Sequence, residues 1–359
     1  LVSGVRGSPT PPLTALLGVS VACGHASSSR LVSAAGRAAR YPRSKSGRAT
    51  RSPAHQEQMP LLRRLVAPEI LACEPLEAGW DLAAVDPPVP AADEPEPIFL
   101  LASGWRTGST LVQRMVLAGG RVLLWGEPFE EHVPALRLAA SVAHLRAASD
   151  EFGDWSIERY SGDLSGQWVG TLGPGAAPLR RAHRAFFEEL LGRPAAGRGC
   201  PRWGFKSVRT PATVVPYLRW LFPRARFAFL VRHPLEAYRS YKRFRWFAVR
   251  PTHLVDSPWR FLAHWEYLAA SFLRAAERGD GPLVRYEDFV SDPERVGALS
   301  AHLGVTLPPS LLESKVGGTK KKPPIGRVDR LACRLLTGTT CRRLGYDPTR
   351  PPEGLAGPE

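Results

Sequence analysis

The sequence lacks a cysteine framework, metal-ligand motifs and long apolar runs. None of its five cysteines forms a C-x-x-C pair, and its nine histidines show no metal-ligand spacing, which argues against a zinc-stabilised or disulfide-stapled fold. No apolar run approaches the ~20 residues that a membrane-spanning helix needs. The sparse, odd cysteine count is typical of a reducing compartment. We expect Cys333 and Cys341 to be unpaired thiols, with a bridge between them as the alternative.

Acidic residues are scarce in the first part of the chain. Residues 1–58 contain eight Lys or Arg and a single acid, Glu57, together with the short apolar patch LTALLGVSVACG. This composition is typical of a targeting segment or a disordered leader. Because the first methionine is Met59, a gene-model artefact is a third interpretation of residues 1–58. We expect a cytoplasmic protein unless this leader directs it to an organelle or the secretory route.

The whole chain is basic, with a formal net charge of +15, and 44% of its residues are hydrophobic. The charge favours an anionic substrate or partner, and the apolar content is enough for a buried core. Residues 59–96 read as an N-terminal extension and a Pro- and acid-rich linker. We predict a main domain over residues 97–347 and a disordered tail over residues 348–359.

Within the main domain, short apolar segments alternate with amphipathic ones. Strands are expected in IFLLAS, RVLLWGE, WGFKSV, RFAFLV and PLVRYED, and helices over 109–118, 130–148, 180–192, 213–222, 235–244, from Pro258, and over 292–304. Alternating strands and helices predict an α/β fold, in which a central parallel sheet is flanked by helices in three layers.

A small-residue loop, SGWRTG, joins the first expected strand to the first helix. Such a turn directs backbone N–H groups and the positive end of the helix dipole at one point, which suits a phosphate or sulfate group. Ser109 and Thr110 add hydroxyls, and Arg106 adds a planar fork of donors. The lysine of nucleotide hydrolases is missing, because Ser109 occupies its position. The alternative is an ordinary Gly/Ser turn.

A second basic position follows the strand RFAFLV. Arg232 comes directly after this strand, and Ser240 follows eight residues later in the next expected helix. A cation at the carboxyl end of a buried parallel strand faces the ligand crevice of such folds. The alternative is a surface arginine whose stem packs on the sheet. Together the two basic loops indicate an anion with two separated phosphates and no metal.

Three segments, SGWRTGSTL, LVRHPLEAYRSY and VRYEDFVSDPE, resemble the hallmark segments of sulfotransferases that use 3′-phosphoadenosine 5′-phosphosulfate (PAPS). The resemblance covers about residues 97–305 and implies a P-loop NTPase-like fold. It also implies that the 5′-phosphosulfate is bound by the first segment and the 3′-phosphate by the second. The matching positions are Arg106, Thr107, Gly108, Ser109 and Thr110 for the former, and Arg232 and Ser240 for the latter.

The catalytic residues that the resemblance implies depart from the cytosolic branch, which has a loop lysine and a histidine base. Arg106 and the carboxylate of Glu127, in LLWGEPF, look closer to the bacterial and protein-tyrosine branch. Glu127 is then the general base, or alternatively a cap of the next helix. Arg106 would stabilise the leaving phosphate. Lys206 ends the third strand and would contact the transferring group or acceptor, unless it is a surface lysine.

The segment KVGGTKKKPP resembles the basic segment with which sulfotransferases cover the nucleotide, and Lys320 is its candidate ligand. A solvated basic loop is the alternative. Arginines such as Arg159 and Arg184 would suit an acidic glycan or peptide acceptor, or plain solvation.

The function expected from the sequence is therefore transfer of a sulfuryl group from PAPS to a hydroxyl or amine acceptor. The expected partners are this nucleotide and an unidentified acceptor, without nucleic acid, metal or a membrane span. A P-loop kinase or nucleotide hydrolase is one rival, and a non-enzymatic polyanion-binding protein is the other. The sequence does not indicate the oligomeric state.

Overall fold

The computed structural model describes residues 60–351 except for 77–81, 83–85, 89–93, 129–132, 144, 146–156, 158–161, 167–171, 244–247, 250–252 and 314–322. The leader, Arg159, Lys320 and most of the predicted tail lie outside the described residues. Within the described part of the chain, no helix combines the length and apolar character needed to cross a membrane.

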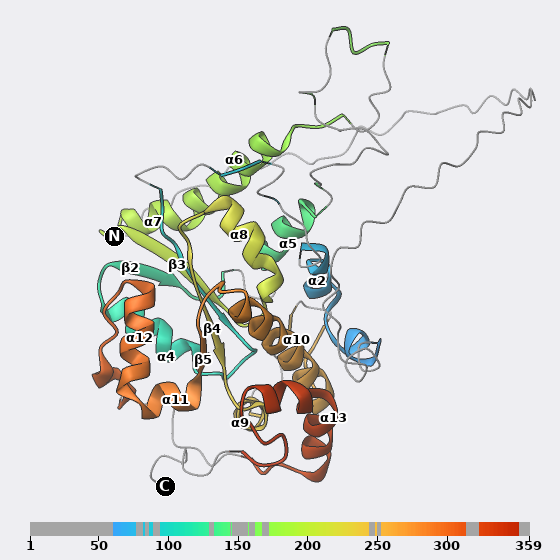
Figure 1. Ribbon diagram of the computed structural model, residues 1–359, viewed down its shortest axis with the longest axis vertical. Helices are drawn as coiled ribbons and strands as arrows, with labels where there is room; N and C mark the ends of the chain where they lie inside the picture. Colours follow the sequence, from blue (N-terminus) through green and yellow to red (C-terminus); the bar gives the residue numbers. More distant parts are fainter. Residues whose placement is uncertain are drawn as a thin grey trace, which may run out of the picture. The chain divides into compact units, whose positions relative to one another are not determined.

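A parallel sheet forms the centre of the fold (Figure 1). Its five strands run in the order β2-β3-β1-β4-β5, and every pair of neighbours is parallel. The strands are β1 (Ile98–Ala102), β2 (Val122–Trp125), β3 (Arg202–Ser207), β4 (Arg226–Val231) and β5 (Leu283–Arg285). All five strands lie within or overlap the segments expected to be strands, which confirms the predicted α/β class.

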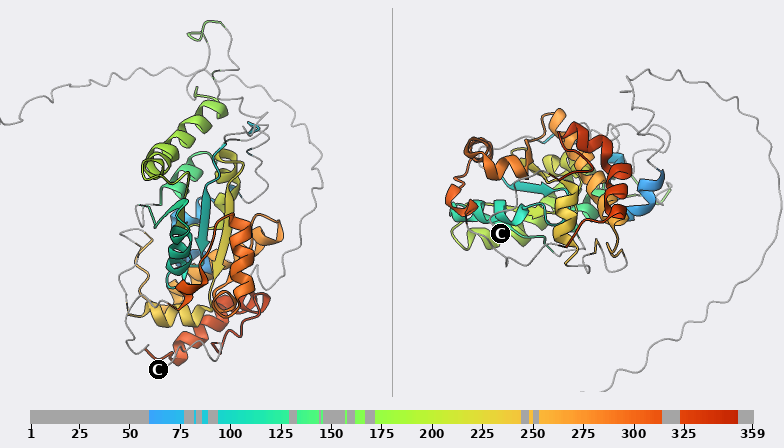
Figure 2. Two further views of the ribbon diagram at one scale, coloured as in Figure 1. Left: turned by 90° about the vertical axis from the view of Figure 1, so that its left-hand side faces the viewer. Right: turned by 90° about the horizontal axis from the view of Figure 1, so that it is seen from below.

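Helices cover both faces of the sheet, as the views in Figure 2 show. They are α2 (Pro68–Leu71), η1 (Glu74–Leu76), α4 (Ser109–Ala118), α5 (Pro134–Ser141), α6 (Ala176–Phe187), η4 (Glu188–Gly192), α7 (Arg193–Ala196), η5 (Ala212–Val214), α8 (Val215–Leu221), α9 (Pro234–Tyr241), α10 (Pro258–Glu277), α11 (Tyr286–Ser291), α12 (Pro293–Leu303), η6 (Pro309–Leu312) and α13 (Arg327–Arg343).

Two predicted boundaries were wrong. The helix expected over residues 130–148 is the shorter α5, which begins at Pro134 after Val133 in a left-handed conformation. The strand expected through Asp288 stops at Arg285, and Tyr286 begins α11. Glu287 and Asp288 then lie in the first turn of that helix, where carboxylates interact favourably with the helix dipole.

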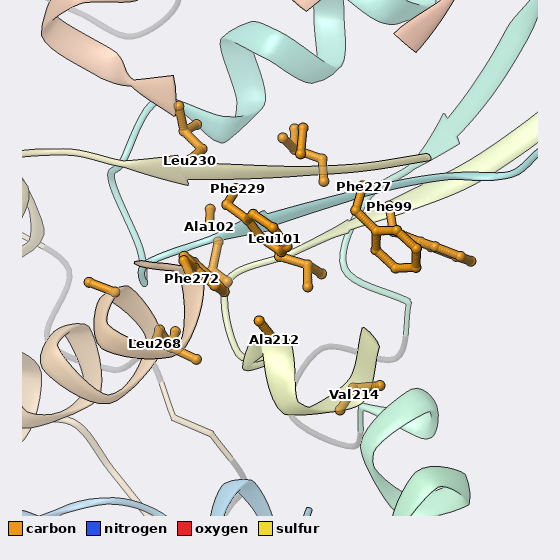
Figure 3. Packing of buried hydrophobic residues seen from close by; sticks show 14 of the residues in the cluster. Phe99, Leu101, Ala102, Ala212, Val214, Phe227, Phe229, Leu230, Leu268 and Phe272 are labelled. Atoms are coloured by element: carbon orange, nitrogen blue, oxygen red, sulfur yellow. The ribbon is translucent and has the colours of Figure 1, made fainter. Parts of the chain in front are cut away.

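The core lies between the sheet and the helices. Figure 3 shows Phe229 on the face of β4 that meets Phe272 of α10, and Leu230 on the opposite face, beneath α4. The rings of Phe229 and Phe272 are 5.3 Å apart. Ile70 and Leu76 from the predicted N-terminal extension are also buried in this core, so that extension packs on the main domain.

The C-terminal helix α13, which was not predicted, packs against α10 (Figure 1). Cys333 and Cys341 are both buried and free, which confirms the expectation of unpaired thiols. They lie eight residues apart on one helix, about 12 Å along its axis, which is too far for a disulfide. The hydroxyl of Thr337 lies between the two sulfur atoms, at 3.2 and 3.3 Å.

The connections bring the carboxyl ends of the strands together. From β1 the chain runs to β2 and back to β3 on one side, and it then crosses to β4 and β5 on the other side. β1 therefore lies in the middle, between β3 and β4, and the crevice outside its carboxyl end is where doubly wound sheets bind ligands. The loops that follow β1, β2, β3 and β4 all open at this edge.

Candidate active site

The loop after β1 is a tight backbone turn. Gly104, Arg106 and Gly108 have φ values of +101°, +65° and +90°. A left-handed conformation costs a residue other than glycine about 1–3 kcal/mol, so the surrounding structure must stabilise Arg106 there. The Thr107 hydroxyl, expected to bind an anion, donates instead to the Gly104 carbonyl oxygen at 3.0 Å and stabilises the turn.

Gly108 leads directly into α4 as its N-cap residue. Its backbone faces the ring of Tyr286, and a Cβ atom built on Gly108 would overlap that ring. Ser109 and Thr110 form the first turn of α4, with Ser109 buried and Thr110 exposed. The first N–H groups of a helix have no partner within the helix, so this end of α4 is suited to an anion.

The two predicted phosphate-binding segments meet in space. Arg106 Nε donates to Ser240 Oγ at 3.0 Å, and Arg232 Nη1 donates to the Arg106 carbonyl oxygen at 3.0 Å. We call Arg106, Arg232 and Ser240 the anion cluster. The side chain of Arg232 is only 12% exposed and its guanidinium lies 4.6 Å from the centre of the Tyr286 ring, so it is not a surface arginine.

Positive charge accumulates in the anion cluster. Desolvation lowers the pKa of the Arg106 guanidinium, although part of the residue is exposed, and the charges of Arg232 and Arg243 lower it further. Arg232 Nη2 lies 3.8 Å from the Glu236 carboxylate, while its Nε is buried and has no hydrogen-bond partner among the described residues. A bound anion would reduce the repulsion between the two guanidinium groups and would accept a hydrogen bond from the Nε of Arg232.

The segment VRYEDFVSDPE is hydrogen-bonded to the segment LVRHPLEAYRSY, which contains Arg232. Glu287 accepts a hydrogen bond from the His233 backbone N–H at 2.9 Å and another from the Tyr346 hydroxyl at 2.6 Å. The ring of His233 is fully buried, and its Nε2 lies 2.8 Å from the Asp347 carbonyl oxygen. His233 therefore points towards the C-terminal segment, and Arg232 is left facing the crevice.

A second group of charges follows β2 and β3. Glu127 Oε1 accepts from Lys206 Nζ at 2.7 Å, and Glu127 Oε2 pairs with Arg209 Nη1. We call Glu127, Lys206 and Arg209 the carboxylate cluster. The side chains of Lys206 and Arg209 are 8% and 5% exposed, whereas that of Glu127 is 21% exposed. Lys206 is thus a buried partner of Glu127 and not a surface lysine.

The environment of Glu127 differs from that of a helix cap. The next described helix, α5, begins seven residues later at Pro134 and has Val133 as its N-cap residue. Both carboxylate oxygens of Glu127 accept from cations, which fixes the orientation of the group. Each carboxylate oxygen can accept two hydrogen bonds, so Glu127 can still accept a proton from a bound substrate hydroxyl.

Arg209 is the residue that sequence reasoning missed. It lies three positions beyond Lys206, and its Nε donates to the Ala248 carbonyl oxygen at 3.0 Å. Its guanidinium also lies 5.2 Å from the centre of the Trp105 ring, in the loop after β1. Arg209 therefore connects that loop to Glu127. The available signal was a second cation just after the strand, at the end of the segment WGFKSVR.

A buried histidine supports this connection from below. The ring of His264, from α10, stacks on Trp105 with 4.7 Å between ring centres, and its Nε2 lies 2.9 Å from the Val208 carbonyl oxygen. Complete burial lowers the pKa of His264 to about 3. The imidazole is therefore neutral at physiological pH, and it packs against Trp105 as an uncharged ring.

The protein is an α/β protein with a parallel sheet. The loop after β1 has no lysine and contacts an arginine, Arg232, that follows the neighbouring strand β4. The sequence profile of the sulfotransferase family matches residues 97–309. The chain belongs to the sulfotransferase family. No protein of curated function matches it.

Solved structures of bacterial sulfotransferases are similar to the chain at low identity. The sulfotransferase domain of the Synechococcus PCC 7002 olefin synthase is 21% identical, with a TM-score of 0.40, over 72% of this chain and 98% of that domain. The domain from the curacin biosynthetic pathway is 19% identical, with a TM-score of 0.38, over 70% and 98%. The Alicyclobacillus acidocaldarius sulfotransferase is 17% identical, with a TM-score of 0.36, over 70% and 97%.

Proposed function

We propose that this protein transfers a sulfuryl group from PAPS to a hydroxyl or amine acceptor, with Glu127 as general base. The observation that carries the proposal is the bond between Arg106 and Ser240 beside Arg232, which unites the two predicted phosphate-binding segments. These cations lie at the same edge of the sheet as the carboxylate cluster. An anionic nucleotide and a proton acceptor would thus have neighbouring places.

The residues of this crevice fit the nucleotide. The unpartnered Nε of Arg232 and the lowered pKa of Arg106 fit a 3′-phosphate bound with Ser240. The turn from Thr107 to Thr110 and the start of α4 fit the 5′ end. From the sequence, Arg106 was expected to stabilise the leaving 5′-phosphate. Its contact with Ser240 favours a role in binding the 3′-phosphate instead. Lys320, the third proposed ligand, lies outside the described residues.

The carboxylate cluster would handle the proton. Bound PAPS supplies the sulfuryl group and a phosphate leaving group. Glu127 accepts the proton of the acceptor hydroxyl as the acceptor oxygen bonds to sulfur and the bond from sulfur to the phosphate oxygen breaks. Lys206 and Arg209 orient the carboxylate, and Lys206 is the cation in this cluster that we assign to the charge spread over the transferring group.

A binding experiment separates this proposal from its rivals. The purified protein is titrated with 3′-phosphoadenosine 5′-phosphate (PAP), with ATP and Mg²⁺, and with heparin, and its melting temperature is followed. At a hundredfold excess over Kd, PAP should add about 2.7 kcal/mol of stability, which corresponds to roughly 5–10 °C. Stabilisation by ATP and Mg²⁺ without PAP would indicate a kinase or hydrolase. Stabilisation by heparin alone would indicate a polyanion-binding protein.

A further inference from the structure

The outer face of α13 exposes a row of large apolar side chains. Eight such side chains are exposed in the described part of the chain, and three of them, Val328, Leu331 and Leu335, lie on this helix. These three residues, which we call the apolar row, are 58%, 51% and 48% exposed. Their spacing of three and four residues aligns them along one side of the helix. Such a row is typical of an interaction surface, whereas single exposed apolar residues are ordinary.

The inner face of the same helix is polar by comparison. It packs against α10 and α9 (Figure 1), and Asp329, Thr337 and Thr340 are buried there alongside apolar residues. Asp329 accepts from Lys242 Nζ and from the Gly326 backbone N–H, both at 2.8 Å. The packing of α13 thus includes buried polar contacts while the apolar row faces outwards. Folding alone favours the reverse placement, because burial of apolar surface is its main driving force.

The charged side chains on the outer face are arginines. Four are exposed there: Arg327, Arg330, Arg334 and Arg342. Arg327 and Arg334 lie within about 60° of Leu331 around the helix axis, so they flank the apolar row. Arg343, at the end of α13, pairs with Glu277, whereas the other four arginines form no ion pair with a described residue. The single acid of α13, Asp329, is buried on the inner face. The outer face is therefore cationic and needs an anionic partner.

An anionic lipid surface meets both requirements of this face. Helices that lie at the bilayer interface place leucines at the boundary of headgroups and acyl chains, and their arginines contact anionic headgroups. A nucleic acid backbone would satisfy the arginines but offers nothing apolar to the row. A second copy of this chain, packed about a two-fold axis, would bring arginines against arginines.

The acid-rich segment of this chain is engaged elsewhere. Its described acids, Asp86, Glu94 and Glu96, pair with the arginines of other elements, among them Arg180 and Arg184 of α6. These carboxylates are therefore not the partner of the outer face of α13.

We infer that the outer face of α13 binds an anionic lipid surface. The apolar row lies at the boundary of headgroups and acyl chains, and Arg327, Arg334 and Arg342 contact the anionic headgroups. The helix lies in the plane of the surface and does not span the bilayer. Three apolar side chains and four charges make this contact reversible. The inference is independent of the sulfuryl transfer proposed above.

The test is cosedimentation of the full chain with lipid vesicles. One set contains phosphatidylcholine alone, and the other contains equal amounts of phosphatidylcholine and phosphatidylserine. We expect binding to the mixed vesicles, little binding to phosphatidylcholine, and weaker binding as the salt concentration rises. Leu335→Ser should weaken binding about tenfold, as for one apolar side chain removed from the boundary. Arg334→Gln should weaken it about fivefold, as for one charge near an anionic surface.

Matched controls come from other helices. Leu117→Ser on α4 and Arg295→Gln on α12 change exposed residues of the same kinds. Both controls should bind the mixed vesicles as the unchanged chain does. All four variants should keep the melting temperature of the unchanged chain, because the four residues are exposed.

Contrary results would overturn the inference in distinct ways. Absent binding to mixed vesicles, or equal binding to both kinds, excludes an anionic lipid surface. Vesicle binding that neither α13 variant weakens more than its control places the contact on another basic segment, such as residues 1–58. Without vesicle binding, a dimer in light scattering that Leu335→Ser dissociates assigns the face to a second copy. Binding of duplex DNA in place of vesicles, weakened by Arg334→Gln but not by Leu335→Ser, assigns it to nucleic acid.

Discussion

The anion cluster and the carboxylate cluster lie at the same edge of the sheet, but their charges are balanced differently. Arg106 and Arg232 repel each other, and the Glu236 carboxylate, which lies 3.8 Å from Arg232, also pairs with Arg239 at 2.7 Å. Glu127, in contrast, is bonded to two cations of its own. The first cluster is suited to an anion that arrives with the ligand, whereas the second is already arranged without one.

The largest effect that separates the clusters is expected from Glu127→Gln. The amide keeps the shape of the side chain but cannot accept the proton, and loss of a general base costs roughly 100-fold or more in kcat. The Kd of PAP, measured by calorimetry, should stay within twofold. Glu277→Gln, at an exposed carboxylate paired with Arg343, is the matched control. Comparable turnover in both variants would remove Glu127 from the mechanism.

Gly108→Ala is expected to do the opposite of Glu127→Gln, and to change the Kd of PAP more than kcat. A Cβ atom there overlaps the ring of Tyr286, which supports Arg232, so the substitution should disturb the anion cluster first. Loss of one charge-assisted contact corresponds to roughly 10–100-fold in the Kd of PAP. Gly120→Ala is the control, because Gly120 also has a positive φ, +72°, but a Cβ atom meets nothing within 4 Å. Equal Kd values in the two variants would show that the overlap is unimportant.

These two clusters also differ in how far the sequence predicted them. The anion cluster follows from local rules: a strand, a glycine turn and a helix place Arg106, and two helical turns separate Arg232 from Ser240. The pairing of Arg209 with Glu127 joins residues 82 positions apart, and its direction depends on how the loops after β2 and β3 lie in the folded chain. No pattern in either segment determines that direction.

The same limit applies to the C-terminal helix. α13 buries Thr337 and Thr340 together with Cys333 and Cys341, so polar residues occupy much of its inner face. An apolar period is the main signal for an amphipathic helix, and here it is weak. Thr340 instead donates to Glu266 of α10 at 2.6 Å, a contact that only the packed structure provides.

The connection between the clusters is tested by Arg209→Lys. Lysine keeps the charge but cannot pair with Glu127, bond to the Ala248 carbonyl oxygen and cover Trp105 at the same time. We expect kcat to fall roughly 5–30-fold, as for a loss of 1–2 kcal/mol, with a smaller change in the Kd of PAP. Arg219→Lys is the control, because Arg219 also pairs with a carboxylate, Asp280, and covers a ring, Phe227. A fall of similar size in the control would mean that Arg209 acts through stability.

The smallest effect is expected from Ser240→Ala, which removes the acceptor of the Arg106 bond and a hydroxyl for the 3′-phosphate. One neutral hydrogen bond is worth about 1 kcal/mol, so the Kd of PAP should rise about fivefold while kcat at saturating PAPS stays unchanged. Ser300→Ala, which removes a hydroxyl bonded to the Val305 carbonyl oxygen on α12, provides the control. If Ser240→Ala lowered kcat as strongly as Arg209→Lys, Arg106 would act on the transferring group through Ser240, and the division between nucleotide binding and proton transfer would have to be abandoned.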